Sequence, residues 1–458
     1  MIKTLFASLR KLFYRVFKTE AIRRIVENSS YLLSATGLTM VVSVIQGIFV
    51  FRMIGAEGIG LLGAIRQFAN NANRLTSFRI NEMVVSYVRR YEEEGEQEKA
   101  AAVFKLAGLF EVAGAVAAFG LIWILAPWGA SFFGQDSSTL PLWIMYGMVV
   151  LVNLLYESST GLLHVFNRFR GIAVISAVQS VVTLCFVVIA YFSNGGIYEV
   201  LTAYILGKLV GAVGVTSTAF FTARKTWGSG WWRAPLGGLR QDRGKLLSFA
   251  VSTNFSHTIT LVAKESETLW VAAFLGLTQA GYYKLALDII SSLKLPIIHL
   301  AKTTYPELSK EIANKRWLSV KDILNRGSRL AAAYSLPVLF GLVFFGKYAM
   351  EFLYTSDSLP AFPLVIVLAI GHSFDNTFFW NRVALLALGR PIFPTAVNFI
   401  GMLLKVGMIF YLVPRFGATA FAVILAGYFI FTVGVSASRV ILDVYRRLSP
   451  VSSLEASV

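Results

Sequence analysis

Charged and polar side chains recur at helical spacing inside the apolar segments of this chain. In the second such segment, Arg66, Asn70 and Arg74 follow one another at intervals of four and therefore share one face of a helix. Asn73 and Ser77 lie on the same arc. Because arginine grips phosphate oxygens in a bidentate way, this face is suited to an anion that carries phosphate.

Three further segments have polar faces of the same kind. In residues 246–275 the face comprises Thr253, His257, Thr260, Lys264, Glu267 and Thr268. In residues 281–304 it comprises Lys284, Asp288, Ser291, Ser292, His299 and Lys302. Residues 31–51 add a neutral face of Thr36, Thr39, Ser43 and Gln46. Ionisable groups at membrane depth are costly unless they meet water or partners, so the four faces predict a water-accessible cavity.

The predicted cavity is cationic, since arginine and lysine outnumber Glu267 and Asp288 on these faces. Low-dielectric walls focus such a field, which favours a negatively charged cargo such as phosphate or diphosphate. We assign cargo binding to Arg66, Asn70, Arg74, His257, Lys264, Lys284, Asp288 and Lys302. An alternative stays open for two pairs, because Lys264 with Glu267 and Lys284 with Asp288 have the spacing of ion pairs on one helix.

Ion coupling is a second role for the titratable members of these faces. The candidates are Glu267, Asp288, His257 and His299. Imidazole titrates near neutral pH, which suits a proton-coupling group. The competing interpretation is that the two histidines are hydrogen-bonded packing residues.

The amino-acid composition indicates whether the chain folds in water or in a lipid bilayer. Its 458 residues are 56% hydrophobic and its mean hydropathy is +0.65, against roughly 45–50% apolar residues in soluble domains. Apolar runs of about 20 residues can cross a hydrocarbon core about 30 Å thick. They predict helices at 31–51, 58–80, 103–126, 140–164, 171–192, 198–222, 246–275, 281–304, 328–352, 362–387, 394–413 and 416–440. We therefore expect an all-α integral membrane protein with about twelve transmembrane helices.

The chain also repeats itself. Gly55 and Gly276 stand 221 residues apart, as do Gly60 and Gly281, and each pair marks the junction of two apolar segments. A repeat of this length indicates two homologous halves. We expect two six-helix lobes, related by a pseudo-two-fold axis, around the central cavity. The four glycines are assigned as structural turn residues.

The basic residues behind the net charge of +17 are distributed unequally among the loops between the predicted helices. Basic residues gather in the linker 223–245, whereas the alternate loops 127–139 and 353–361 carry no Lys or Arg. This bias predicts cytoplasmic termini and argues against a nucleic-acid partner. The expected parts are a basic amphipathic segment 1–28, an N-lobe 29–222, a basic cytoplasmic linker 223–245, a C-lobe 246–441 and a cytoplasmic tail 442–458.

A second polar set lies in the fourth and tenth segments. It comprises Glu157, Thr160, His164, Asn167, His372, Asp375, Asn376 and Arg382. These groups either extend the cavity or tie helices together within each half. We expect the packing role.

The two glycine turns carry a family resemblance. They read Phe51-Arg52-Met53-Ile54-Gly55-Ala56-Glu57-Gly58-Ile59-Gly60 and Leu275-Gly276-Leu277-Thr278-Gln279-Ala280-Gly281-Tyr282-Tyr283-Lys284-Leu285-Ala286. The first resembles the R-x-L-G-p-e-x-F/Y-G segment of polysaccharide flippases, and the second resembles that family's G-x-x-x-x-G-x-Y-x-x-A. With helix number, basic loops and repeat, the resemblance over about residues 29–441 is to the Wzx-type flippases of the multidrug/oligosaccharidyl-lipid/polysaccharide (MOP) exporter superfamily.

The resemblance implies a function and a site. Members of this family flip an isoprenoid-diphosphate-linked oligosaccharide, such as an O-antigen or exopolysaccharide repeat unit, from the cytoplasmic to the outer leaflet by rocking two lobes. Their first, second, seventh and eighth helices line the cavity. The family's cavity cations vary, so the cationic residues assigned here rest on the polar faces alone. Glu57 matches the family's acidic turn residue, whereas Gln279 stands at the repeat position and implies no symmetric role.

We expect transport by alternating access, with no catalysis, no cofactor and no metal. The chain has no G-x-x-x-x-G-K-S/T sequence, so direct ATP use is not expected, and an H⁺ gradient, an Na⁺ gradient or the membrane potential stay open. Expected partners are a lipid-linked oligosaccharide, membrane lipids and polysaccharide polymerase or assembly proteins. The expected location is a bacterial or archaeal inner (plasma) membrane.

Three alternatives stay open. A peptidoglycan-precursor flippase of the same superfamily is expected to carry two further C-terminal helices. A multidrug antiporter shares the two-lobe plan but is expected to have a less cationic cavity. A membrane glycan polymerase or ligase needs a large external region, and the predicted outer loops are short.

Overall fold

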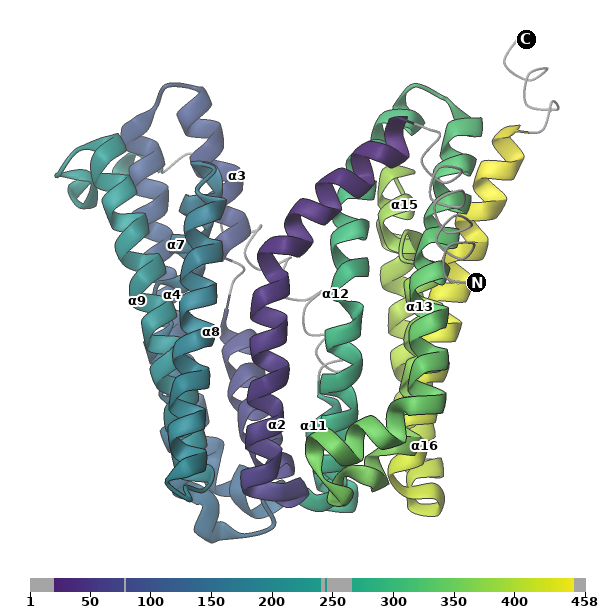
Figure 1. The fold of residues 1–458 in the computed structure, drawn as a ribbon. Coiled ribbons are helices and arrows are strands. Elements are labelled where there is room, and N and C mark those ends of the chain that lie inside the picture. The colour runs from purple at the N-terminus through teal and green to yellow at the C-terminus, as the bar shows by residue number, and fades with distance from the viewer. Residues whose placement is uncertain (1–19, 78–79, 240–243, 245–265, 449–458) are drawn as a thin grey trace, which may run out of the picture. The chain divides into compact units, whose positions relative to one another are not determined.

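The structure is a computed structural model that describes residues 20–77, 80–239, 244 and 266–448. Side chains of 20–36, 38, 295, 299 and 302 lie outside the description. Within the described ranges every regular element is a helix, and eight helices are long and apolar enough to cross a membrane (Figure 1). The prediction of an all-α membrane protein is confirmed.

Two of these helices each contain two predicted spans. α2 (Glu20–Thr76) and α16 (Ile392–Leu448) both run for 57 residues. Each is interrupted by a glycine with non-helical backbone angles, Gly55 in α2 and Gly417 in α16. A positive φ is available to glycine without steric penalty, which explains why the interruption occurs at this residue type.

The other spans follow the predicted order. Single helices replace the third, fifth, sixth and ninth predicted spans: α4 (Gln97–Phe132), α8 (Phe169–Phe192), α9 (Ile197–Trp227) and α13 (Trp317–Tyr354). α12 (Leu277–Ala313) contains the eighth span, and α11 (Glu267–Leu275) is the described end of the seventh. Residues 246–265 and most of the predicted amphipathic segment 1–28 lie outside the described residues.

The described residues form two compact units, which are treated separately. The first unit contains residues 38–284, and the second contains the residues up to Gly37 together with those from Leu285 onward. The first unit thus includes α11 and the first turns of α12 besides the spans of the first half. The lobe bounds 29–222 and 246–441 stay a prediction.

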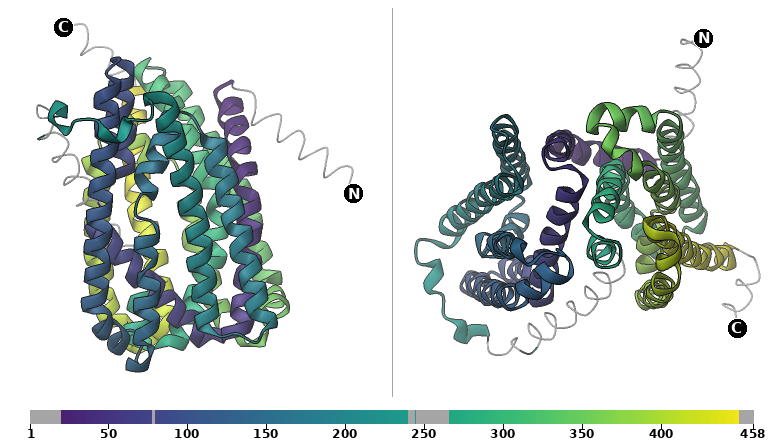
Figure 2. Two further views of the ribbon diagram at one scale, coloured as in Figure 1. Left: turned by 90° about the vertical axis from the view of Figure 1, so that its left-hand side faces the viewer. Right: turned by 90° about the horizontal axis from the view of Figure 1, so that it is seen from below.

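In the first unit, α3 (Ile80–Glu93) packs against α4 and α7 (Tyr156–Val165), and α8 runs beside α9 (Figure 2). The core of this unit is rich in alanine on α4, where Ala100 and Ala107 are completely buried. Small side chains let helices approach one another closely in a membrane, where lipid removes most of the hydrophobic driving force. In the second unit α13, α14 (Phe362–Thr377) and α16 pack together.

The fourth and tenth spans are both broken, whereas the sequence predicted continuous helices. The fourth consists of α5 (Leu140–Gly147), α6 (Val149–Val152) and α7, and the tenth of α14 and α15 (Asn381–Ala387). The break between α6 and α7 (residues 153–155) and that between α14 and α15 (residues 378–380) contain no Pro or Gly. Instead the Asn153 side-chain amide donates to the Val149 carbonyl at 3.1 Å, and that of Asn381 donates to the Phe378 carbonyl at 2.8 Å. Side-chain amides thus satisfy carbonyl groups beside each break, as broken helices at membrane depth require.

The first part of the predicted linker is folded. α9 continues to Trp227, and the 3₁₀ turns η2 (Trp231–Arg233) and η3 (Leu236–Leu239) follow it. The Trp227 indole donates to the Glu92 carboxylate at 2.6 Å, and the Lys105 ammonium donates to the Ala234 carbonyl at 3.3 Å. These bonds hold the segment against α3 and α4. From its charge alone, the segment was predicted only to be a basic linker.

Candidate functional site

The two glycine turns have the same backbone conformation. Gly55 has φ 64° and ψ −171°, and Gly276, its repeat partner, has φ 86° and ψ 173°. This region of backbone space is essentially confined to glycine. The repeat found in the sequence is therefore also a repeat of local structure.

The other two turn glycines contact each other's hairpin within the first unit. A methyl group at Gly60 would lie 1.9 Å from the Leu277 carbonyl oxygen, and one at Gly281 would lie 1.7 Å from the Ala56 oxygen. Ala56 and Leu277 are themselves 221 residues apart, so the contact is reciprocal. Backbone meets backbone here with no room for a Cβ atom, which accounts for glycine at both positions.

The polar face of α2 meets α9 through an arginine and a tyrosine. The Arg66 guanidinium carbon lies 4.6 Å from the centre of the Tyr204 ring, a cation–π contact. Lys208 stands one helical turn after Tyr204 and is close enough to Arg66 for the two charges to repel. Of the other predicted cargo residues on α2, Asn70 is exposed and Arg74 half-buried. α9 thus places a second cation beside Arg66.

Neighbouring amides on α2 bond to the start of the second hairpin. The Gln67 side chain donates to Asn71 at 2.8 Å, and Asn71 donates to the Ser266 hydroxyl at 3.1 Å. Beside Ser266, the buried Glu267 carboxylate accepts from the Tyr283 hydroxyl at 2.9 Å. Glu267, predicted as a coupling carboxylate, is therefore held in a hydrogen bond between α11 and α12.

The remaining predicted site residues differ in burial and in their contacts, and some lie outside the described residues. Lys284 is half-buried, and its stem would contact a methyl group at Gly63 at 3.2 Å. Asp288 is exposed, and its backbone carbonyl accepts from the Ser291 and Ser292 hydroxyls at 3.0 and 2.9 Å. These serines thus bond to their own helix. His257 and Lys264 lie outside the described residues, as do the side chains of His299 and Lys302.

A polar cavity of about 120 Å³ lies inside the first unit, between α2, α4, α7 and α9. Its charged lining consists of Glu111, Glu157 and Lys208, accompanied by the polar Asn73 and Ser77. The Glu111 carboxylate accepts the backbone N–H groups of Glu157 at 2.6 Å and of Ser158 at 2.9 Å. It thereby caps α7, the half-helix that begins after the break, whose first N–H groups have no partner within the helix.

Glu157 is also bonded to Ser77 and Asn81, which follow one another after α2 and in α3. Its carboxylate accepts from the Ser77 hydroxyl at 3.4–3.5 Å, and its carbonyl accepts from the Asn81 amide at 3.3 Å. Sequence reasoning had favoured a packing role for Glu157 and had not named Glu111. Glu111 was nevertheless the lone acidic residue of the third predicted span, which is itself a signal at membrane depth.

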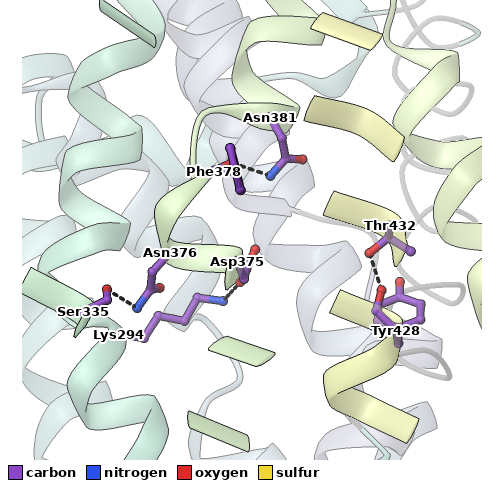
Figure 3. A network of polar contacts seen from close by, with 8 residues as sticks. All are labelled: Lys294, Ser335, Asp375, Asn376, Phe378, Asn381, Tyr428 and Thr432. Atoms are coloured by element: carbon purple, nitrogen blue, oxygen red, sulfur yellow. Dashed lines mark hydrogen bonds and ion pairs between the residues drawn. The ribbon is translucent and has the colours of Figure 1, made fainter. Parts of the chain in front are cut away.

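The second unit has a polar network at its own broken span (Figure 3). The Lys294 ammonium forms an ion pair with Asp375, and Asn376 donates to the Ser335 hydroxyl at 3.3 Å. A nearby cavity, lined by Ser335 and Asn376 among others, measures only about 20 Å³. Here the groups tie α12, α13 and α14 together.

Three other members of the second polar set, Thr160, His164 and His372, contact neighbouring residues. The Thr160 hydroxyl donates to the Tyr156 carbonyl at 2.7 Å, and the His164 ring stacks on Phe169 at 5.2 Å. The His372 ring lies 4.6 Å from that of Phe429. Asn167 adopts a positive φ of 55° beyond the end of α7, and Arg382 is exposed.

Comparison with known proteins identifies the family of the chain. Residues 25–311 match the family model described as polysaccharide biosynthesis protein. The chain belongs to this family. The chain is also 26% identical over 361 residues to the inner membrane protein YghQ of Escherichia coli (strain K12), across 76% of the chain and 98% of YghQ.

Solved structures show the fold of this family member. An inward-facing multidrug resistance MATE family transporter of the MOP superfamily superposes with a TM-score of 0.75 at 13% identity, covering 89% of this chain and 95% of that one. The lipid II flippase MurJ, in an inward closed conformation, gives 0.67 at 14% identity over 91% and 90%. The predicted family resemblance and the helical transporter fold are confirmed, and the protein is a multi-pass membrane protein.

Proposed function

We propose that this protein flips an isoprenoid-diphosphate-linked oligosaccharide, of the O-antigen or exopolysaccharide type, from the cytoplasmic to the outer leaflet. Membership in the polysaccharide biosynthesis family and the transporter fold support this role. The observation that carries the proposal is the pair of cations formed by Arg66 and Lys208 beside Tyr204. Two cations at membrane depth repel each other and are stabilised when an anion lies between them.

Arg66, Tyr204 and Lys208 each have a separate role in the proposed binding of the diphosphate. The Tyr204 ring fixes the Arg66 guanidinium through the cation–π contact, so less conformational freedom is lost when it binds phosphate. Lys208 supplies a compact second charge for the diphosphate. The diphosphate and glycan cross by alternating access while the isoprenoid tail stays in lipid, and no covalent chemistry is required.

The proposal includes a location and partners. The protein acts in a bacterial or archaeal inner membrane with both termini in the cytoplasm, as the basic linker and loops favour. The lipid-linked oligosaccharide, membrane lipids and polysaccharide polymerase or assembly proteins are its partners. Coupling to an H⁺ gradient, an Na⁺ gradient or the membrane potential is part of the proposal.

A multidrug antiporter is the second candidate, favoured by the TM-score of 0.75 to a MATE family transporter. An Arg66–Lys208 pair repels cationic drugs, which lowers their affinity for the cavity. Transport of a cationic dye by the wild-type protein, undiminished by added lipid-linked oligosaccharide, would select this candidate.

The test is lipid-linked oligosaccharide flipping by the purified protein in liposomes. We expect Arg66→Ala/Arg74→Ala and Lys208→Met each to lower the flipping rate at least tenfold, since loss of one charge-assisted contact to phosphate costs roughly 1.5–3 kcal/mol. The matched control is Arg415→Ala, because Arg415 also stacks on a tyrosine, Tyr411, at 4.3 Å, but on an exposed stretch of α16. Equal rates in all variants would remove Arg66 and Lys208 from the cargo site.

A further inference from the structure

We propose that the polar cavity of the first unit is a proton-binding site whose state controls the anion affinity at Arg66. Glu111 and Glu157 share one proton, and Lys208 connects the pair to Arg66. The anion part of this inference rests on the proposed function, whereas the proton part stands on the cavity alone.

The cavity can hold the water that proton exchange requires. Its volume of about 120 Å³ accommodates several molecules, since about 10–15 Å³ of such volume suffices for one. A buried water also needs two to four polar partners. Carboxylates, the Lys208 ammonium, the Ser77 hydroxyl and the Asn73 amide supply them.

The two carboxylates are too close to be ionised independently. The Glu111 carboxylate accepts the backbone N–H of Glu157, so it ends where the Glu157 side chain begins, and the two carboxylates repel each other. Two like charges that share a site at membrane depth retain a proton between them. The other titratable groups lining the cavity are Tyr156 and Lys208, and Lys208 carries the only positive charge among its described lining residues.

Lys208 links the pair to Arg66. It lines the cavity with the carboxylates, and it lies on α9 one turn after Tyr204, which holds the Arg66 guanidinium, near enough for the Lys208 and Arg66 charges to interact. When the pair loses its proton, the two negative charges offset Lys208, and the positive field at Arg66 weakens. When the pair holds its proton, the field recovers and an anion binds more tightly. Because linkage is reciprocal, anion binding must draw a proton into the cavity.

The proton site is tested first, without any anion. The full-length protein in lipid nanodiscs is titrated with acid while infrared difference spectra of the carboxyl C=O band are recorded. We expect a titrating band in the wild type that the double variant Glu111→Gln/Glu157→Gln lacks. Glu94→Gln, at a carboxylate exposed in a surface ion pair, keeps the band. Identical spectra for the wild type and the double variant overturn the proton site.

The linkage is tested with inorganic pyrophosphate as the probe. Calorimetric titration in two buffers of different ionisation enthalpy gives the protons taken up per pyrophosphate bound. We expect the wild type to take up more protons than Glu111→Gln/Glu157→Gln, by at most about one, because one proton is shared. Lys208→Met removes this excess but keeps the infrared band.

The outcomes separate the two proposals. A wild type that shows the infrared band but binds no pyrophosphate contradicts the anion site and the proposed function, and leaves the proton site standing. Pyrophosphate binding with equal proton uptake in the wild type and the double variant overturns the link through Lys208.

Discussion

The two broken spans have similar backbones but different chemistry. In the first unit the break before α7 opens on a cavity of about 120 Å³ with two carboxylates and one lysine. In the second unit the break after α14 lies beside a direct Lys294–Asp375 ion pair and a cavity of about 20 Å³. The broken span, present in both halves, thus lines a cavity with uneven charge in one half, and in the other half it forms a charge-paired joint in which the Lys294–Asp375 ion pair ties helices together. The break alone does not determine which of the two forms.

The largest effect is expected where charge is paired in the second unit. Lys294→Met leaves the partly buried Asp375 without its cation and is expected to lower the free energy of unfolding by about 3 kcal/mol. Denaturant titration in detergent measures this change. The double variant Lys294→Met/Asp375→Leu is expected to recover most of the loss, since no unpaired charge remains.

A surface pair provides the matched control. Lys99 pairs with Glu96 at 2.7 Å with both side chains about two-fifths exposed, so Lys99→Met is expected to change the free energy of unfolding by about 0.5 kcal/mol or less. If Lys294→Met is as mild as Lys99→Met, the second unit's joint is not held by charge.

A smaller effect is expected in the first unit. Glu111→Ala removes the acceptor from two N–H groups of α7, but cavity water can take its place, so we expect a loss of about 1 kcal/mol. The same denaturant titration gives the value. A loss equal to that of Lys294→Met would mean that the cavity is dry and the contrast between the two breaks is false.

The last effect is a gain in stability and concerns the loop before the tenth span. Thr355 has φ 87° and ψ 167°, a conformation essentially confined to glycine. In the corresponding loop of the first unit, Gln135 has a φ of 55°. Thr355→Gly is expected to raise the free energy of unfolding by about 1 kcal/mol. Thr355→Ala retains the Cβ atom and should bring no such gain; equal values for the two variants would contradict the strain.

Periodicity and spacing were sufficient for the fold, because they report on features that each segment carries by itself. Apolar runs gave the helices, and the glycine repeat gave turns whose positive φ at Gly55 and Gly276 is a local requirement. The breaks in the fourth and tenth spans were not predicted, because apolar periodicity does not register the side-chain bonds of Asn153 and Asn381 that satisfy carbonyl groups beside them.

The candidate site was predictable only in part. A polar stripe shows which face of α2 is polar, but it does not show which helix lies opposite. For that reason Arg66 was found and Lys208 was not. Ser291 and Ser292 had the correct spacing, yet a serine hydroxyl on a helix readily bonds to the carbonyl one turn earlier, as both do here.

The close contact between Gly60 and Gly281 has a consequence for how the duplicated halves can diverge. Each glycine leaves room for the carbonyl of the other copy, so a side chain gained by one hairpin would strike the main chain of its twin. Most duplicated segments are free to drift once their roles separate. These two hairpins instead pack directly against each other. We therefore expect substitutions at Ala56, Gly60, Leu277 and Gly281 to occur in matched pairs across related sequences.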